Sequence, residues 1–152
     1  MKNIFSIFKK KPLIIKYKKL NGAAVEPKRG HYGDAGFDLV ATHVERLDEN
    51  RVLIHTGIAV EIPYGYQGTL RSRSRVHKTG AWLSSGTSTI DAGYRGEIKA
   101  IFYHKGENLP FEVGERFGQL IISPVPEVRY VESEELSESE RGTGGYGSTG
   151  TK

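Results

Sequence analysis

Apolar residues recur at short intervals along most of this chain, in runs of strand length that are rich in Val, Ile, Thr and Tyr. Gly, Pro, Asn or Asp residues bound these runs, as they do at turns between strands. Several strands at such spacing are typical of a β-sandwich or jelly roll, so the predicted fold is all-β. The expected strands are 13–18, 37–42, 52–62, 66–72, 97–104 and 117–131.

One segment between the expected strands, Val76 to Leu83, lacks clean alternation and contains His77 and Lys78. We interpret it as a single short helix, although Gly80 weakens that interpretation because glycine disfavours helical backbone. The pattern therefore predicts a jelly-roll β-barrel or sandwich with at most one short helix.

The length of 152 residues is enough to bury one sizeable core but not two. We assign this core to a β domain over residues 13–131, preceded by a basic, flexible head at 1–12. Residues 132–140 are acidic and polar, cannot supply much core, and are interpreted as a linker. Residues 141–152 form a glycine-rich C-terminal arm, which we expect only a ligand or a neighbouring chain to order.

The net charge of +4 is unevenly distributed. Residues 1–20 carry seven lysines and no acid, so the remaining 132 residues hold 15 basic and 18 acidic groups. Because the chain without its head is slightly acidic, a nucleic-acid partner is not expected. The head itself could touch nucleic acid or anionic lipid, or could simply keep the chain in solution.

The chain contains no cysteine, which excludes disulfides and thiolate metal sites and suits a reducing cytoplasm. The apolar stretch at residues 4–8 is too short for a signal peptide or a bilayer span. We therefore expect a soluble, intracellular, cytoplasmic protein without a membrane partner. The five histidines lack metal-ligand spacing, and no Gly-Lys-Ser/Thr phosphate loop occurs, so a zinc site or P-loop mechanism is not expected.

Two aspartates, Asp38 and Asp91, lie in turn-like segments with glycine and apolar neighbours. Apolar neighbours partly desolvate a carboxylate, and an ionised carboxylate can act as a general base toward water. On spacing alone, the capping of an Asx turn explains both residues better.

Two segments are rich in hydrogen-bond donors that suit phosphate oxygens. Residues 71–75 alternate arginine and serine, and residues 141–150 combine five glycines with Arg141, Ser148 and Thr149. Tyr146 adds a face on which a base can stack. A solvated strand and a disordered tail explain the same residues. The glycines of the tail formally match a dinucleotide-binding fingerprint, but the strand before and the helix after them are missing.

Taken in order, these segments resemble the five motifs of the trimeric dUTPase family, and the resemblance runs from about residue 13 to residue 150. It implies a jelly roll of the dUTPase type, assembled as a homotrimer whose three active sites lie between subunits, with the arm of one chain closing over a neighbour's site. It also implies hydrolysis of dUTP to dUMP and pyrophosphate, which lowers dUTP and supplies dUMP for thymidylate synthesis. The motifs correspond to residues 35–39, 73–74, 86–96, 116–120 and 141–150.

The resemblance also implies roles for particular residues. Asp91 would orient and deprotonate the water that attacks the α-phosphorus, while the second catalytic carboxylate, Asp38, supports the site near the sugar. Tyr94 would pack against the deoxyribose and leave no room for a 2′-hydroxyl, and Tyr146 would stack on the uracil. A Mg²⁺ ion would be held by the triphosphate and waters, without a direct protein ligand. The other implied substrate-binding residues are Arg73, Ser74, Arg75, Ser85, Thr89, Ile90, Lys99, Arg116, Gln119, Arg141, Gly147, Ser148 and Thr149.

The second motif departs from the family, because Leu70 to Lys78 lacks the proline, glycine and alanine that are usual there. Its repeated Arg-Ser pair allows two registers, and counting back from Asp91 favours Arg73-Ser74.

Two alternatives remain open from the sequence. The first is a dCTP deaminase, or a bifunctional dCTP deaminase/dUTPase, which shares the fold but relies on a glutamate base. The hairpin here has Ile90-Asp91 and the full glycine-rich tail is present, which favours dUTPase. The second alternative is a non-enzymatic jelly-roll binding or regulatory protein. It would not explain why Asp38, Asp91, Gln119 and Arg141 occur together.

Overall fold

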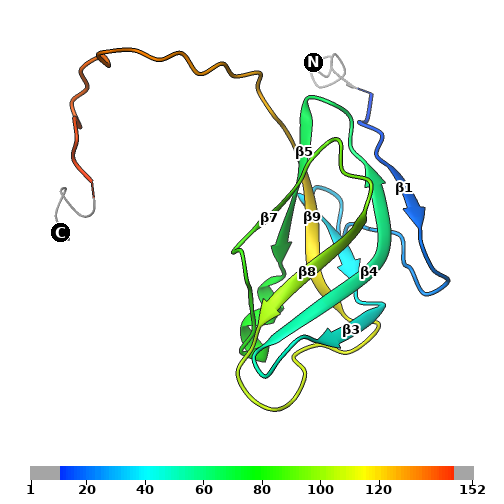
Figure 1. Cartoon of the computed structure of the whole chain (residues 1–152). Helices are drawn as coiled ribbons and strands as arrows, with labels where there is room; N and C mark the ends of the chain where they lie inside the picture. The colour runs from blue at the N-terminus through cyan, green and yellow to red at the C-terminus, as the bar shows by residue number, and fades with distance from the viewer. Residues whose placement is uncertain (1–10, 146–152) are drawn as a thin grey trace, which may run out of the picture.

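The computed structural model describes residues 11–145, in which two antiparallel sheets enclose one core (Figure 1). The first sheet has the strand order β1-β4-β8-β6, and β3 also pairs with β4. Its strands are β1 (Lys16–Lys19), β3 (His43–Arg46), β4 (Arg51–Glu61), β6 (Trp82–Leu83) and β8 (Glu97–Tyr103). The second sheet has the order β2-β9-β5-β7, with strands β2 (Gly36–Val40), β5 (Tyr66–Ser72), β7 (Ser88–Ile90) and β9 (Arg116–Pro124).

Neighbouring strands in both sheets are mostly distant in sequence, as in the pairs β2–β9 and β4–β8. All strand pairs among the described residues are antiparallel. Crossed connections between two facing antiparallel sheets define a jelly roll. The all-β, jelly-roll prediction is therefore confirmed.

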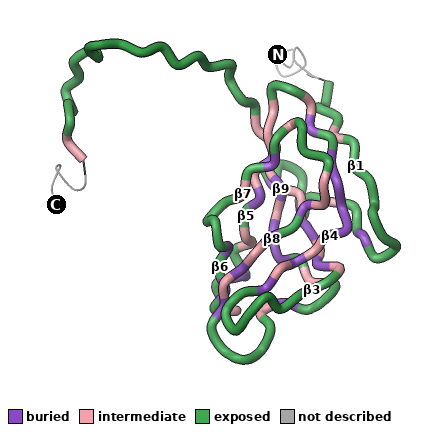
Figure 2. Tube along the Cα trace, in the orientation of Figure 1, coloured by how far each residue is buried: buried purple, intermediate pink, exposed green. Residues whose placement is uncertain are grey.

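The core lies between the sheets because the longer strands, such as β4, β8 and β9, bury side chains between them (Figure 2). Along β8, Ile98, Ala100 and Phe102 are buried, while the residues between them are less so. Phe102 packs edge-on against Phe111 and Phe117, with ring centroids 4.9 and 6.0 Å away. The apolar residues that recur at every second position of the sequence thus point into the core, as expected for strands.

The predicted helix from Val76 to Leu83 is wrong in its bounds and type. A 3₁₀-helix spans Ser74–Thr79 instead, and Gly80 ends it with a φ of 67° in the left-handed region. After this turn Trp82 of β6 pairs with Tyr103 of β8, and the two rings stack with centroids 5.6 Å apart. Glycine adopts positive φ without steric cost, so the helix ends at Thr79, four residues earlier than predicted, and the chain enters a strand.

The strand predictions agree with the structure best where both ends are marked by turns. The bounds of β5 are the predicted 66–72, β4 is shifted from the prediction by one residue at both ends, and β8 ends one residue earlier than predicted. The predicted strand 13–18 begins later, at Lys16, and 117–131 ends at Pro124. The strands β3, β6 and β7 have only two to four residues, too few to show a period, and were not predicted.

Beyond β9 the chain leaves both sheets as an extended segment, drawn in orange in Figure 1. Its residues from Pro124 to Thr143 are all exposed. The predicted linker, 132–140, lies within this segment, while the division of the chain into head, β domain, linker and arm stays a prediction. No helix among residues 11–145 has the length and apolar character needed to cross a bilayer.

Candidate functional site

The second sheet and the segments beside it form a polar cleft of about 530 Å³. Register brings its groups together, because Asp38 of β2 lies opposite Gln119 of β9, and Gln119 lies opposite Arg71 of β5. Arg73 follows the last residue of β5 and so reaches the same end of the sheet. The lining residues are Gly30, His31, Asp34, Gly36, Asp38, Arg73, Ser74, Arg116 and Gln119.

Asp38 is the electrostatic centre of this cleft. Its side chain is 13% exposed and contacts two guanidinium groups, with Arg116 Nη1 donating to Oδ2 at 2.9 Å and Arg73 Nε 3.4 Å from Oδ1. A carboxylate that is mostly buried needs such partners to offset its lost hydration. Each guanidinium has five N–H donors, so donors remain for a second anion. The two arginines outnumber Asp38 and make this part of the cleft suited to phosphate oxygens.

Gly36 makes room for Gln119 in the cleft. A Cβ atom at Gly36 would lie 2.8 Å from Cδ and 2.9 Å from Cβ of Gln119, closer than such atoms approach. The glutamine side chain can therefore cross β2 only because residue 36 is glycine. Gly36 belongs to the first motif and Gln119 to the fourth, so the two motifs meet physically here.

The predicted base, Asp91, lies elsewhere, in the exposed turn that joins β7 to β8. The Tyr94 N–H donates to the Asp91 carbonyl at 3.0 Å, which closes the turn. The Tyr94 hydroxyl donates to the Glu97 carbonyl at 2.9 Å. A Cβ at Gly96 would lie 2.6 Å from Cζ of Tyr94, so the ring needs glycine at that position. Asp91 and Tyr94 are thus held in one small unit.

Glu97, the first residue of β8, is a carboxylate beside this turn with a perturbed pKa. Burial acts to raise the pKa of Glu97, but hydrogen bonds from the Gly57 N–H and from His55 outweigh it. Electrostatic interactions with His55 and Lys99 act in the same direction as those bonds, and the net result is a pKa of Glu97 below the ordinary value.

The cleft and the Asp91 turn lie at opposite ends of β5. Ile90 pairs with Gly68, so Asp91 extends beyond that level toward Gln67, whereas Arg73 follows Ser72 at the other end. From the level of Gln67 to Ser72 the strand advances roughly 16 Å at its usual rise per residue. One copy of the chain therefore does not bring the predicted base to the predicted phosphate-binding residues.

The other predicted site residues divide between these regions or lie apart from both. Thr89 and Ile90 belong to β7, and the Ser85 hydroxyl is 2.8 Å from that of Ser88. Arg75 is not among the residues that line the cleft, and its Nη2 donates to Glu115 at 3.0 Å. Lys99 lies on β8 opposite His55.

Arg141 lies on the extended C-terminal segment, where its Nε donates to the Gly144 carbonyl at 2.9 Å. Four other predicted residues, Tyr146, Gly147, Ser148 and Thr149, are outside the described residues.

The loop before β2 contributes cleft residues that sequence reasoning missed. Gly30, His31 and Asp34 line the cleft, and the His31 N–H donates to Asp34 Oδ2 at 2.7 Å. In the sequence His31 was only one of five scattered histidines. The available signal was the turn pattern of glycine and aspartate directly before the first motif, which indicates a loop but not its place beside Arg73.

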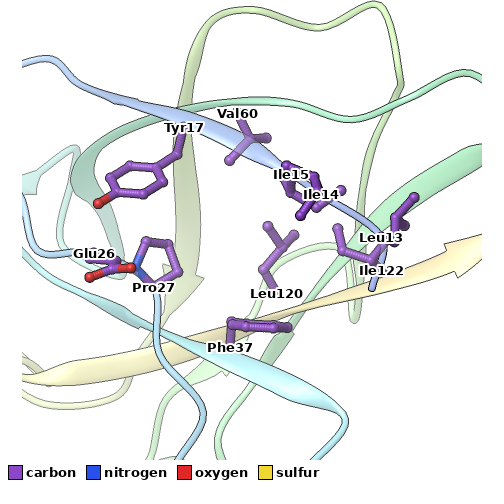
Figure 3. Close-up of a pocket in the computed structure, with 10 residues that line it drawn as sticks. All are labelled: Leu13, Ile14, Ile15, Tyr17, Glu26, Pro27, Phe37, Val60, Leu120 and Ile122. Carbon is purple, nitrogen blue, oxygen red and sulfur yellow. The ribbon is translucent and has the colours of Figure 1, made fainter. Parts of the chain in front are cut away.

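A second hollow, of about 270 Å³, has a different chemistry (Figure 3). Its lining is almost entirely apolar, with Glu26 the only charged residue, so it does not suit a phosphate chain. The remaining lining residues are Leu13, Ile14, Ile15, Tyr17, Pro27, Phe37, Val60, Leu120 and Ile122.

Among residues 11–145, no three His, Asp or Glu side chains are grouped to hold a metal ion.

Comparisons with known proteins agree on one family. The family model described as dUTPase matches residues 23–150. A "Deoxyuridine 5'-triphosphate nucleotidohydrolase" of Nocardia farcinica is 42% identical over 140 residues, covering 90% of this chain and 85% of that protein. A protein of the same name from Alkaliphilus metalliredigens is 40% identical, covering 91% and 98%. The solved dUTPase of Staphylococcus bacteriophage 80alpha with dUPNHPP superposes with a TM-score of 0.79 at 31% identity, covering 91% and 99%.

Proposed function

This chain belongs to the dUTPase family and hydrolyses dUTP, and from that premise we propose that its active site is assembled from separate parts of different copies of the chain. The activity is that of a dUTP diphosphatase, which releases dUMP and pyrophosphate. The observation that carries the proposal is the separation of Asp91 from the Arg73 cleft along β5. Chemistry at a phosphorus atom requires the activated water and the phosphate donors within contact distance of one substrate.

A homotrimer satisfies this requirement with three equal sites. In a closed ring, the cleft of one chain meets the Asp91 turn of its neighbour, and each contact repeats around the axis. The exposed segment from Pro124 to Thr143 is long enough to carry the glycine-rich arm away from its own sheets. We assign that arm to the closing of a neighbour's site.

Within such a site, Asp91 accepts a proton from a water molecule as the water oxygen attacks the α-phosphorus. The bond from that phosphorus to the bridging oxygen breaks, and pyrophosphate leaves with the electron pair. The exposed position of Asp91 at the tip of a turn allows it to reach into another chain's cleft. Proton transfer to a positioned carboxylate and charge stabilisation by fixed donors are the two contributions required.

The cleft supplies the charge stabilisation. Arg73, Ser74, Arg116 and Gln119 donate to the phosphate oxygens, while Asp38 holds both arginines in place. The arm adds Arg141, Tyr146, Gly147, Ser148 and Thr149. When it closes, it excludes bulk water from the phosphates while negative charge develops on them. Arg75 and Lys99 would act only if the neighbouring chain or the arm brings substrate to them.

The sugar and base are placed against the Asp91 turn. Tyr94 packs on the deoxyribose and excludes a 2′-hydroxyl. β7 is an edge strand of its sheet, so backbone groups on its outer side are free of ladder partners and can bind the uracil edge at Thr89 and Ile90, near Ser85. Recognition by backbone geometry suits a base that differs from cytosine only in its hydrogen-bonding edge.

The substrate in this proposal is the complex of dUTP with Mg²⁺. The charged donors of the cleft are guanidinium groups, and both oxygens of Asp38 face them, so these residues fit phosphate oxygens rather than a metal ion. The ion would neutralise phosphate charge, and the triphosphate and waters would hold it. An intracellular, cytoplasmic location belongs to the same proposal and is supported by the cysteine-free sequence.

The direct test measures pyrophosphate release from dUTP, dCTP, dTTP and UTP with Mg²⁺, with Asp91→Asn alongside. We expect appreciable turnover only of dUTP, and a variant that binds dUTP but loses several orders of magnitude in kcat. Release of ammonia from dCTP would contradict the assignment and support the deaminase alternative. Absence of turnover on every nucleotide would support a binding or regulatory protein.

A further inference from the structure

Glu97 connects the Asp91 turn to a distortion in the neighbouring strand β4. Between His55 and Ala59 the register of β4 against β8 shifts, because four steps along β4 correspond to only two along β8. Such a bulge frees backbone groups from the ladder. At this bulge Gly57 has a φ of 64°, and its N–H donates to Glu97 Oε1 at 2.8 Å.

The bulge is firmly held on its other sides. The Gly57 carbonyl accepts the Leu20 N–H at 2.7 Å, and the buried Thr56 hydroxyl donates to the Ile98 carbonyl at 2.7 Å. A Cβ at Gly57 would lie 2.6 Å from Nδ2 of Asn21, so this position admits only glycine. The bulge therefore gives Glu97 a fixed point of attachment.

His55 is the second partner of the Glu97 carboxylate. Its Nδ1 is 3.1 Å from Glu97 Oε2, and its Nε2 is 3.5 Å from Glu45 Oε2. The side chains of His55 and Glu97 are 22% and 21% exposed, so the pair is partly shielded from water. Charge-assisted bonds in such surroundings are stronger than on an open surface.

The backbone carbonyl of Glu97 connects the anchored carboxylate to Tyr94. The Glu97 carbonyl accepts the Tyr94 hydroxyl at 2.9 Å, and the Tyr94 N–H is bound to the Asp91 carbonyl. Tyr94 is 42% exposed, so apart from its contact with Gly96 packing constrains the ring weakly, and the hydroxyl bond to the Glu97 carbonyl holds its outer end. Moving the Glu97 peptide would move the ring relative to Asp91.

We propose that Glu97, held by Gly57 and His55, is a positioning residue that sets the ring of Tyr94 and thereby the discrimination between deoxyribose and ribose. The inference rests on the proposed role of Tyr94 at the sugar. Glu97 touches no reacting atom. Its carboxylate anchors the start of β8, and its carbonyl anchors the tyrosine.

The test compares Glu97→Ala, Glu97→Gln and Glu45→Ala by kcat and KM for dUTP and UTP. Glu97→Ala removes the anchor, and we expect the ratio of kcat/KM for dUTP over UTP to fall about tenfold, chiefly through a higher KM for dUTP. Glu97→Gln keeps an oxygen for the Gly57 N–H and should retain most of the discrimination. Glu45→Ala alters only the far side of His55 and should match the unaltered protein.

A measurement without substrate separates this inference from the proposed function. In protein labelled with ¹³C-tyrosine, the Tyr94 ring signal is identified by its loss in Tyr94→Phe. We expect it to shift in Glu97→Ala and to return toward its original position in Glu97→Gln. An unaltered protein that fails to turn over dUTP would overturn the proposed function while leaving this link testable. Unchanged discrimination and an unshifted Tyr94 signal in a folded Glu97→Ala protein would overturn the link itself.

Discussion

Asp91 and Arg73 lie at opposite ends of β5, since Asp91 follows the residue paired with Gly68 and Arg73 follows Ser72. The chain therefore presents two partial sites, the Asp91 turn and the Arg73 cleft. Each is well ordered by its own hydrogen bonds and ion pairs. A shared site between copies explains why both are exposed in the single chain.

Mixing two inactive variants tests the shared site. Asp91→Asn leaves the cleft intact, and Arg73→Ala leaves the turn intact, so an equimolar mixture that is dissociated and reassembled contains some sites built from two intact parts. Random assembly gives about a quarter of such sites, and we expect about that fraction of the unaltered kcat. The measurement is pyrophosphate release before and after reassembly.

The control mixture combines Asp91→Asn with Tyr94→Ala, which alter the same turn. It should recover no activity, because no site in the mixture receives an intact turn. Equal recovery in both mixtures, or none in the first despite full reassembly, would contradict the shared site.

The contact between Gly36 and Gln119 predicts a defect in phosphate binding. In Gly36→Ala the new Cβ would lie 2.8 Å from Cδ of Gln119, so the glutamine side chain must shift from its place in the cleft. We expect KM for dUTP to rise roughly tenfold, because one phosphate donor is lost, with a smaller change in kcat. Gly22→Ala is the matched control, since a Cβ there meets no atom within 4 Å. An unchanged KM in a folded Gly36→Ala protein would show that Gln119 does not bind substrate.

Truncation after Glu140 tests the arm. The truncation removes residues 141–152, of which residues 141–143 are exposed in the single chain, and it leaves every strand intact, so it should not unfold the sheets. We expect the oligomer to persist in size-exclusion chromatography with light scattering, while turnover of dUTP falls to a few per cent or less, because water is no longer excluded. If truncation dissociates the oligomer instead, the arm has a role in assembly rather than in closing the site.

The lowered pKa of Glu97 predicts a dependence of stability on pH. Because the native pKa lies below the ordinary value of 4.5, the ionised carboxylate stabilises the fold fully above about pH 4.5. This contribution is lost as the pH falls through the lower, native pKa. We expect the Tm difference between the unaltered protein and Glu97→Gln to be largest near neutral pH and to shrink in acid, as measured by calorimetry. A difference that stays constant from pH 7 to pH 3 would mean that the Glu97 charge is not stabilising.

Local sequence determined much of this protein. The alternation and turn residues around 66–72 set a strand with the observed bounds, and the spacing of Asp91, Tyr94 and Gly96 set a turn whose contacts span three residues or fewer. Such features depend on backbone preferences and neighbours in the chain, so they can be read from a short window. The same reasoning failed at Gly80, where a single positive φ replaced the expected helix end with β6.

Only the tertiary structure decided which distant groups meet. Asp38 and Arg116 are 78 residues apart in sequence, and His55 and Glu97 are 42 apart, yet each pair is in contact. These contacts follow from the register of β2 on β9 and from the bulge of β4 on β8, which the packing of one shared core selects. The separation of Asp91 from Arg73 has the same origin. No short window of sequence contains the register of these strands, because they are far apart in the chain and pair only as the chain folds.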